Sequence, residues 1–461
     1  MIMKTSRLLY IGYILLCGCS LNIPLEDQFS DPDAITDVSS ARSLLATAYN
    51  DLPQHIFEFA VLSDDFYPSS KLIKDAGLQN LYRWREVELT ELADNLWTEY
   101  YAVISTINAL QNRLDAVTTI SPEEESEKNI IACEAKALKA KCYFDLLRLF
   151  APSYPGNEEK EGIILKDQVE LDYLPRSSIK KCVTEIRQLL KEARHPDNTP
   201  DKIYWLSDYA VTYLQAEVEL YTGNYLEVLN LTNELITLFP EETLGNNPYT
   251  ALWSNETSKA RIFAKYQSDQ IYQDIRYDTY ASGDYLVMND EITYSPQDKR
   301  KTWSEIEFVM DNTQPVRLFG KYNKMNREEI PGMYVNIWRA AGIWLMRAEA
   351  LARTSKPGAA TELMNRFLTQ RGAEPLETFT NPEKLLEQIL EERRKEFVGE
   401  GERYFDLKRC HKTLNKYKEY GNGILLTLQP GDYRWTLPIP ASEYRYNEKI
   451  NQNEGWPKIK I

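Results

Sequence analysis

Apolar residues recur at intervals of three and four positions in several long segments of the chain. This spacing places apolar side chains on one face of an α-helix, because the helix has about 3.6 residues per turn. The pattern predicts helices over residues 97–114, 131–149, 206–220, 228–238 and 341–351. We therefore expect a mainly α-helical protein, with Trp97, Tyr100 and Trp344 on apolar stripes that form its core.

Short interruptions of the helical pattern by turn residues divide the predicted helices into pairs of neighbours. Gly223 and Asn224 interrupt one pattern, and both residue types favour a helix end followed by a tight turn. The pair that they divide is about as long as a tetratricopeptide repeat. The predicted pairs are 205–239, 349–367, and 133–150 with 178–193. Each pair leaves an apolar face that only a neighbour can cover, so the pairs should stack into a helical-repeat scaffold.

The stretch from about residue 240 to residue 335 has a different composition. It is rich in Asn, Asp, Tyr, Gly and Pro and shows little helical periodicity. Two runs within it, "DYLVMND" and "VRLFGKYN", are typical of short β-strands bounded by turn residues. Long irregular segments in a regular scaffold usually carry function. We expect this insert to face a ligand.

The first residues have the order of a secretory signal. A short basic start precedes an apolar run from Leu8 to Leu16 that is too short for a permanent membrane span. The segment "LCGC" that ends this run resembles the lipobox of bacterial lipoproteins. On this interpretation residues 1–18 are removed, Cys19 carries the lipid anchor, and residues 19–36 form an extended tether. The alternative is an ordinary secretory signal with a chance cysteine.

Charge and residue counts argue against several functions. The net charge of −15 opposes binding to nucleic acid, whose phosphate backbone would be repelled. Only three histidines occur, without metal-binding spacing, and no phosphate-binding loop is present, so we predict no metal and no cofactor. Cys133 and Cys142 lie on opposite faces of a predicted helix and cannot bridge each other, so these cysteines, like Cys182 and Cys410, are expected as buried free thiols.

Four motifs, in order along the chain, resemble those of one family. They are "EAKALKAKCYFDLLRLF" from Glu134, "LMRAEALAR" from Leu345, "EERRKEFVGEGERYFDLKR" from Glu391 and "LPIPASEYRYNEKINQNEGW" from Leu437. Together with the lipobox, they resemble the SusD/RagB family of outer-membrane nutrient-binding lipoproteins. The resemblance covers the chain from Cys19 to its C-terminus.

The resemblance implies a SusD-like fold, with residues 37–461 as a single domain of tetratricopeptide-like helix pairs and a ligand-facing insert. It also implies a lipid-anchored protein at the cell surface, in the outer membrane, with no catalytic activity. In the family, such proteins bind oligosaccharides and deliver them to a partner TonB-dependent transporter of the SusC type. Two departures matter here. Lys139 stands where the family usually has Arg, and no acidic residue follows Cys19 directly, which leaves the leaflet of anchoring open.

The carboxylates between Glu391 and Arg409 allow two interpretations. Paired carboxylates perform acid–base chemistry in glycoside hydrolysis. However, each acid in this segment has a basic neighbour, which lowers its pKa and makes it a poor general acid. We therefore predict an ion-pair network at a helix end. The amides of Asn451, Gln452 and Asn453 are predicted to fix the C-terminal segment.

Sugar binding requires flat aromatic faces that stack on C–H groups and planar polar side chains that reach hydroxyls. Residues 63–85 and the insert offer such side chains, and the family draws its ligand site from the same two parts of the chain. The candidate ligand-binding residues are Asp65, Tyr67, Tyr82, Trp84, Arg85, Tyr277, Tyr280 and Trp303. We expect Trp84 and Trp303 to lie on exposed loops and to form a glycan platform. For each aromatic residue, the alternative is packing in the core.

Three functions remain open from the sequence. The first is a glycan-binding lipoprotein that serves a transporter. The second is the same scaffold capturing peptides or another nutrient, and the third is a structural or assembly lipoprotein. An aromatic platform in a cleft would favour sugars, a deep polar cavity would favour peptides, and the absence of any concave pocket would favour the third.

Overall fold

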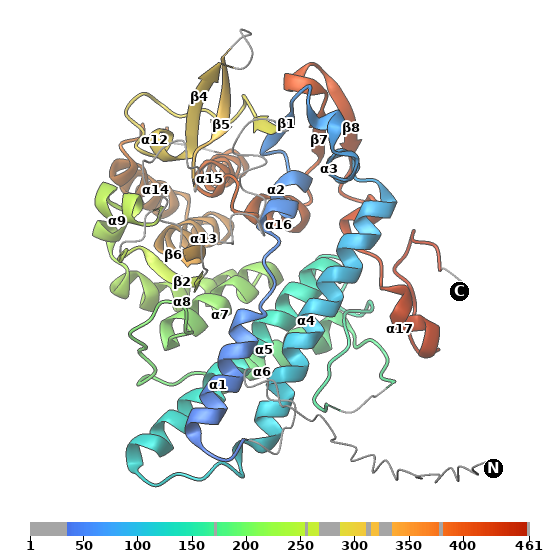
Figure 1. Cartoon of the computed structure of the whole chain (residues 1–461). Helices are drawn as coiled ribbons and strands as arrows, with labels where there is room; N and C mark the ends of the chain where they lie inside the picture. Colours follow the sequence, from blue (N-terminus) through green and yellow to red (C-terminus); the bar gives the residue numbers. More distant parts are fainter. Residues whose placement is uncertain are drawn as a thin grey trace, which may run out of the picture.

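The computed structural model of the chain describes residues 35–169, 173–253, 257–266, 286–309, 315–321, 334–377 and 381–458. Helices make up most of this part of the chain, and its strands form short antiparallel pairs. The long helices lie in the lower and middle parts of Figure 1, and most strands lie at the top. The prediction of a mainly α-helical protein with short strands in the insert is confirmed.

The bounds of the elements are as follows. The helices of the first half are α1 (Val38–Asn50), α2 (Ile56–Leu62), α3 (Ala76–Tyr82), α4 (Glu86–Leu114), α5 (Pro122–Phe150), α6 (Ile179–Glu192), α7 (Asp208–Thr222) and α8 (Tyr225–Leu238). The later helices are α9 (Asn246–Ala251), α12 (Arg300–Ser304), α13 (Ala340–Arg353), α14 (Pro357–Arg371), α15 (Pro382–Phe397), α16 (Glu402–Arg409) and α17 (Ala441–Tyr446). Short 3-10 helices are η2 (Leu72–Lys74), η3 (Glu241–Leu244), η5 (Glu419–Gly421) and η6 (Tyr433–Trp435). The strands are β1 (Phe66–Pro68), β2 (Arg261–Tyr266), β3 (Leu286–Met288), β4 (Glu305–Val309), β5 (Pro315–Phe319), β6 (Tyr334–Arg339), β7 (Leu414–Tyr417) and β8 (Ile424–Leu428).

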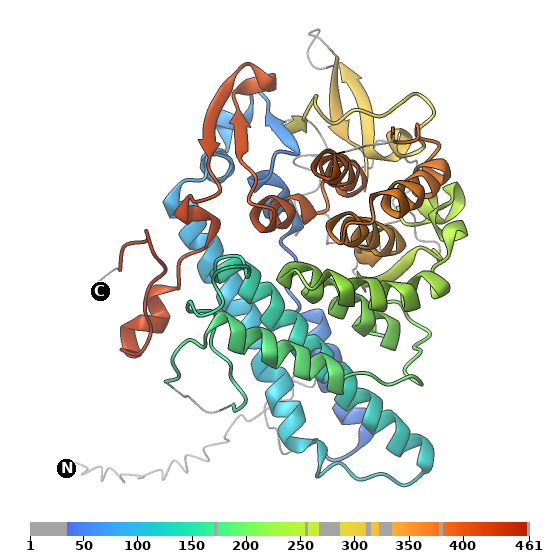
Figure 2. The same ribbon diagram turned by 180° about the vertical axis from the view of Figure 1, so that it is seen from behind.

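The long helices pack in succession, each against its neighbour in the chain. Helix α4 packs on α5, α5 on α6, α6 on α7 and α7 on α8, and the series continues through α13 and α14. Figure 2 shows this stack from behind. The three predicted helix pairs are confirmed as α5–α6, α7–α8 and α13–α14.

Local sequence sets the ends of these helices. Helix α7 ends at Gly223, whose φ of 78° lies in the left-handed region that glycine adopts without strain. Helix α14 begins at Pro357, since proline fits the first turn, where its missing N–H is not needed. At the start of α5, the Ser121 hydroxyl accepts a hydrogen bond from the Glu124 backbone N–H at 3.3 Å.

One continuous hydrophobic cluster contains buried residues from Ile35 to Trp456 and joins the stacked helices to the strands. Trp97, Tyr100 and Trp344 are buried in it, as predicted from their helix stripes. The four cysteines of the described chain are free, which confirms that part of the prediction. Cys142 and Cys182 are buried, whereas the other two are half-buried.

The strand pairs bring distant segments together. Strand β1 pairs with β3 in the order Phe66 with Met288 and Tyr67 with Val287. Strands β2 and β6 pair beside the helix stack, and β4–β5 and β7–β8 form two hairpins. Strand β3 falls within the first of the two runs of the insert that predicted strands, and β5 overlaps the second but begins one residue before it, at Pro315.

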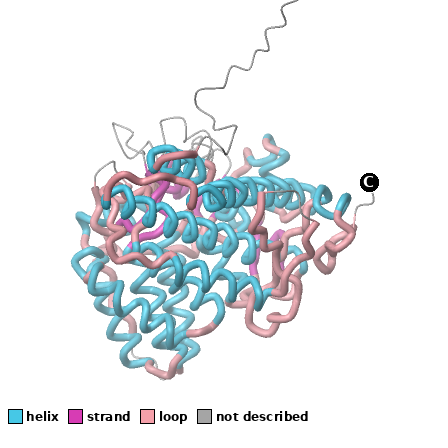
Figure 3. The backbone as a smooth tube through the Cα atoms, turned by 90° about the horizontal axis from the view of Figure 1, so that it is seen from below, coloured by secondary structure: helices cyan, strands magenta, loops and turns pink. Residues whose placement is uncertain are grey.

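The C-terminal segment is fixed by side-chain amides, as its motif predicts. The Asn453 amide donates to the carbonyls of Phe150 and Leu437 at 2.9 and 2.7 Å. Gln452 accepts from the Ile439 N–H at 2.7 Å and donates to the Ile439 carbonyl at 2.9 Å. Seen from below, loops gather on the side of this segment, and helices occupy most of the remainder (Figure 3).

Among the described residues, no helix combines the length and the apolar character that crossing a membrane requires.

Candidate ligand-binding site

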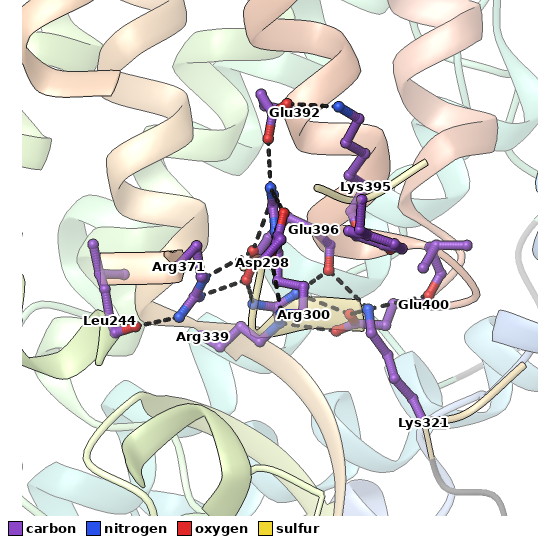
Figure 4. A network of polar contacts seen from close by, with 12 residues as sticks. Leu244, Asp298, Arg300, Lys321, Arg339, Arg371, Glu392, Lys395, Glu396 and Glu400 are labelled. Carbon is purple, nitrogen blue, oxygen red and sulfur yellow. Dashed lines mark hydrogen bonds and ion pairs between the residues drawn. The ribbon is translucent and has the colours of Figure 1, made fainter. Parts of the chain in front are cut away.

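A buried charge network lies beneath the strands at the top of Figure 1. In Figure 4, the carboxylate of Glu396 in α15 is surrounded by arginines. Arg371 donates two hydrogen bonds to it, at 3.0 and 2.6 Å, and Arg339 donates another. Burial would raise the pKa of Glu396, but the surrounding guanidinium groups hold it well below its usual value. The predicted ion-pair network is confirmed, and such a carboxylate is a poor general acid.

A second set of buried charges fixes the segment that leads into β1. Arg403 of α16 donates to both carboxylate oxygens of Asp64, at 2.7 and 2.9 Å. Burial favours the neutral form of Asp64, yet Arg394 and Arg403 lower its pKa below the usual value. The next carboxylate, Asp65, accepts a hydrogen bond from the Gly399 N–H at 3.0 Å. Burial raises the pKa of Asp65 to about 6, and the charge of Asp64 adds to the rise.

Strands β1, β3, β4, β5, β7 and β8, with η2, α3 and η5, form what we call the apex. A small hydrophobic cluster inside it contains Tyr67, and the Tyr67 ring lies 5.1 Å from the ring of Tyr417. The Tyr420 hydroxyl lies 3.3 Å from the N–H of Ser70 and accepts a hydrogen bond from it. Gly421 has a φ of 77°, and a Cβ there would lie 2.8 Å from the Tyr67 ring. The turn after β7 therefore needs glycine to close over β1.

A surface pocket of about 420 Å³ opens between η2 and α3 on one side and the β7–β8 hairpin on the other. We call it the apex pocket. It is lined by Pro68, Ser69, Leu72, Ile73, Gln79, Tyr82, Arg83, Lys418, Glu419, Asn422 and Leu425. The pocket thus combines an aliphatic rim with charges of both signs and with amide groups. Such groups can reach the hydroxyls of a sugar or the ends and side chains of a peptide.

The structure distributes the predicted ligand residues over several environments. Tyr82 lines the apex pocket, but its side chain is only 1% exposed, and its hydroxyl donates to the Tyr417 carbonyl at 3.1 Å. Tyr67 and Asp65 are buried, and Arg85 is exposed at the start of α4. Trp303 is half-buried on the short helix α12, so the prediction that it lies on an exposed loop is wrong. Outside the described residues lie Cys19, Tyr277 and Tyr280.

The prediction that Trp84 lies on an exposed loop is wrong. Its side chain is fully buried, and its indole N–H donates to the Leu62 carbonyl at 2.9 Å. The ring lies 5.9 Å from Tyr404 and 4.8 Å from Trp435, so it shares the core with aromatic residues more than 300 positions away. At Trp84 the backbone adopts a φ of 54° between α3 and α4. Burial against these distant aromatic rings outweighs the polar surroundings that suggested an exposed loop.

Sequence reasoning also missed one side of the apex pocket. Lys418, Glu419, Asn422 and Leu425 come from the β7–β8 hairpin, which lies outside both regions that were expected to bind ligand. The signal that could have revealed this hairpin is Asn422 followed by Gly423, because Asn-Gly between two strand-like runs is typical of a hairpin turn. Within the described ranges, no group of His, Cys, Asp and Glu side chains is arranged to hold a metal ion.

The chain is similar to known proteins over most of its length. A family model described as the SusD family matches residues 194–456. SusD-like protein P38 of Formosa agariphila is 23% identical over 480 residues, which cover 88% of this chain and 90% of that protein. A solved SusD superfamily protein from Bacteroides thetaiotaomicron has a TM-score of 0.75 at 19% identity and covers 91% of this chain and 100% of its own. A solved SusD-like carbohydrate binding protein from Bacteroides vulgatus has a TM-score of 0.76 at 17% identity, with 90% and 97% coverage. The structures share the fold, and because the family model matches more than half of the chain, the chain belongs to the SusD family.

Proposed function

We propose that this protein is a lipoprotein of the outer cell surface that binds an oligosaccharide and delivers it to a TonB-dependent transporter of the SusC type. Membership of the SusD family supports nutrient binding. The carbohydrate binding named for the Bacteroides vulgatus structure supports a sugar as ligand. The signal of residues 1–18, the lipidated Cys19, the tether of residues 19–36 and a single domain over residues 37–461 belong to the same proposal. The continuous hydrophobic cluster supports the single domain.

The apex pocket is the observation that carries the proposal. Arg83 on one side faces an opening whose other side carries Lys418, Glu419 and Asn422. Planar and charged side chains of this kind donate to and accept from sugar hydroxyls, and the aliphatic rim can cover a C–H face. The pocket is concave and lies at the surface, which argues against a purely structural or assembly role.

The surroundings of Glu396 and Glu400 support an ion-pair role for these two carboxylates rather than acid–base chemistry. Glu396 and Glu400 are each held by at least two cationic groups, including Arg339, which pairs with both. A hydrolase would need one carboxylic acid that remains protonated near neutral pH. Because the arginines hold the pKa of Glu396 far below that range, we propose no hydrolytic step for this cluster.

Ligand binding is tested with the soluble chain that begins at Ser20. A glycan array identifies a ligand, and isothermal titration then compares Arg83→Ala and Lys418→Ala with the unmodified protein. We expect each variant to bind about tenfold more weakly, the loss of roughly one hydrogen bond to a charged group. Lys74→Ala is the matched control, because Lys74 is an exposed lysine on η2 that does not line the pocket. Unchanged affinity in both pocket variants would rule out the apex pocket as the site.

Peptide capture is the second candidate function. Ile73 is 66% exposed and Leu425 is 37% exposed, and an aliphatic rim around mixed charges also suits a peptide. Mass spectrometry of small molecules released from the purified protein distinguishes the two. If peptides are recovered and no glycan on the array binds, peptide capture replaces sugar binding as the proposed function.

Membrane anchoring has its own test. We expect Cys19→Ser to release the protein into the soluble fraction, because the residue proposed to carry the acyl chains is gone. A Cys17→Ser variant serves as the control and should still fractionate with membranes. Membrane association of the Cys19→Ser protein would place the anchor elsewhere.

A further inference from the structure

A second pocket, separate from the apex pocket, lies beside the helix stack. It has a volume of about 190 Å³ and opens between the C-terminal end of α1, the segment before α7, and β2. In Figure 1, β2 lies left of centre at mid-height, and α1 lies below it and nearer to the centre. No residue lines both pockets. We call it the aromatic pocket, because most of its lining is formed by rings: Tyr49, Tyr204, Trp205, Phe263 and Tyr266.

The outer rings form a connected surface. The Tyr204 ring lies 5.7 Å from Trp205 and 5.8 Å from Tyr266, and Tyr266 lies 5.8 Å from Tyr334 on the paired strand β6. Tyr266 is 46% exposed, and the other three side chains are half-buried. The rings therefore have surface that a small ligand can contact.

The inner rings are fixed before any ligand arrives. Glu134, which is only 1% exposed, accepts hydrogen bonds from the Tyr49 hydroxyl and from Arg42, both at 2.7 Å. The Arg42 guanidinium lies 4.9 Å from the Trp205 ring centre, and the Tyr49 ring lies 4.9 Å from Trp205 in an edge-on arrangement. Trp205 is thus held from two sides. A preorganised ring costs less conformational entropy on binding than a mobile one.

The polar groups of the pocket narrow the class of ligand. Asn50 is exposed at the end of α1, and Lys265 donates to the Leu52 carbonyl at 2.6 Å. Lys265 lines the pocket, and its positive charge disfavours a cationic ligand such as a quaternary ammonium group. Aromatic faces next to an amide and a cation suit a sugar ring, which has C–H faces and a rim of hydroxyls.

Protein docking fits the pocket less well. Large exposed apolar patches mark protein interfaces. Of the strongly exposed large apolar side chains in the described chain, only Tyr266 lines the aromatic pocket, whereas aliphatic ones lie at the apex and on α8. A small concave site lined mostly by aromatic rings matches a carbohydrate better than a protein surface.

We propose that the aromatic pocket is a second carbohydrate-binding site, which takes one or two units of a neutral or acidic glycan by stacking on Tyr204 and Tyr266. The ligand class rests on the function proposed above, but the location does not depend on the apex pocket. The protein would then hold a glycan at two places, one near the strands of the apex and one beside the helix stack.

Native gels that contain a soluble polysaccharide test the proposal, with glycogen, barley β-glucan, arabinoxylan and polygalacturonate as probes. Retardation gives an apparent Kd for the soluble chain from Ser20. We expect Tyr204→Ala and Tyr266→Ala each to weaken binding to at least one probe by about tenfold, as the loss of one stacked ring should. Tyr204→Phe and Tyr266→Phe should bind nearly as well as the unmodified protein, because stacking uses the ring face. Tyr173→Ala is the control, since Tyr173 is similarly exposed (47%) but lies outside the pocket.

A variant that fills the pocket but keeps every aromatic ring separates loss of binding from loss of folding. Ala46 lines the aromatic pocket from α1, so Ala46→Gln should fill it without removing a core contact, and should weaken binding as the alanine variants do. If all the aromatic-pocket variants bind like Tyr173→Ala while Arg83→Ala loses binding, the second site is wrong and the apex site stands. If the unmodified protein binds none of the probes, the second site is overturned for these glycans, and peptide release then decides the proposed function.

Discussion

The helix stack and the apex are stabilised by different interactions. In the stack, fully buried apolar side chains such as Leu138, Leu146 and Leu214 join helices that are neighbours in the chain. Around the apex and α15, buried charges join segments that are far apart. Arg403 donates a hydrogen bond to Asp64, which lies 339 positions away in the sequence, and Lys416 donates to the Val61 carbonyl, 355 positions away.

The difference lies in how precise each type of contact must be. Apolar contacts are non-directional, and a stripe tolerates exchange between residues of similar size. A buried charge is stable only when its particular partners are in place, because an uncompensated charge in the interior is costly. Single substitutions in the helix stack should therefore lower the free energy of unfolding moderately, whereas substitutions of buried charges around the apex and α15 should lower it strongly.

The largest effect is expected for Glu396→Gln. This change leaves three arginines without their shared carboxylate, and breaking a buried ion pair in this way costs roughly 3–5 kcal/mol. Urea unfolding of the two proteins at pH 7 measures the difference. The matched control is Glu192→Gln, which removes an exposed pair with Lys136 and should cost less than about 1 kcal/mol. Equal effects of the two changes would remove the distinction between the regions.

In the scaffold, Leu138→Ala should cost about 3 kcal/mol of unfolding free energy. Leu138 is fully buried on α5, and removing its side chain deletes apolar contacts and leaves a cavity. Leu226→Ala on α8 is the control, because Leu226 is 65% exposed and should change stability by no more than about 0.5 kcal/mol. A loss at position 138 larger than that of Glu396→Gln would reverse the proposed ranking.

Lys408 is a buried charge that binds the end of a helix of the stack, so its substitution tests both kinds of contact at once. Its ammonium group comes from α16 and donates to the carbonyls of Leu149 and Ala151 at the end of α5, at 3.4 and 2.9 Å. Burial lowers the pKa of Lys408 to about 7, and Arg148 adds to the effect. Lys408→Met should cost about 2 kcal/mol, because buried carbonyls lose their donor.

The control for Lys408 is Lys412→Met. Lys412 is 43% exposed, so the same substitution there should leave thermal unfolding nearly unchanged. Hydrogen exchange gives a further measurement, since amides in the last turn of α5 should exchange faster in Lys408→Met. Unchanged exchange there would show that Lys408 does not hold the end of that helix.

The smallest effect is a change in the pH dependence of stability. The pKa of Asp65 is raised to about 6, whereas an unfolded aspartate titrates near 3.9. The folded state therefore binds more protons between these values, so this residue makes stability fall as pH rises from about 4 to 6. In Asp65→Asn this contribution disappears, and the slope should change by at most about 1.4 kcal/mol per pH unit.

Asp64 is expected to change stability with pH in the opposite direction to Asp65, so Asp64→Asn serves for comparison. The pKa of Asp64 is lowered by its arginines, so its contribution is present above the unfolded pKa and is lost as pH falls below it. Asp64→Asn should therefore lose stability at pH 7. Identical pH profiles for the two variants would contradict the assignment of these adjacent carboxylates to different environments.

Site residues could be predicted from the sequence only where their surroundings are set by residues of the same segment. Residues 63–85 do supply one side of the apex pocket, including Tyr82 and Arg83. Trp84, in the same segment, is buried by Tyr404 and Trp435, which the local sequence does not reveal. The aromatic pocket was not foreseen, because Tyr49, Trp205 and Tyr266 come from three separate segments and none of these alone suggests a binding site.

The sequence by itself determined the long helices of the stack from 97–114 onward, their pairing and the ion-pair character of the Glu391–Arg409 motif. These features depend on spacing within a few turns, on turn residues such as Gly223, and on the charges of near neighbours. Only the tertiary structure decided which aromatic rings are buried and which line a pocket. An aromatic ring can pack in the core or stack on a ligand, and which of these it does depends on the segments that fold against it.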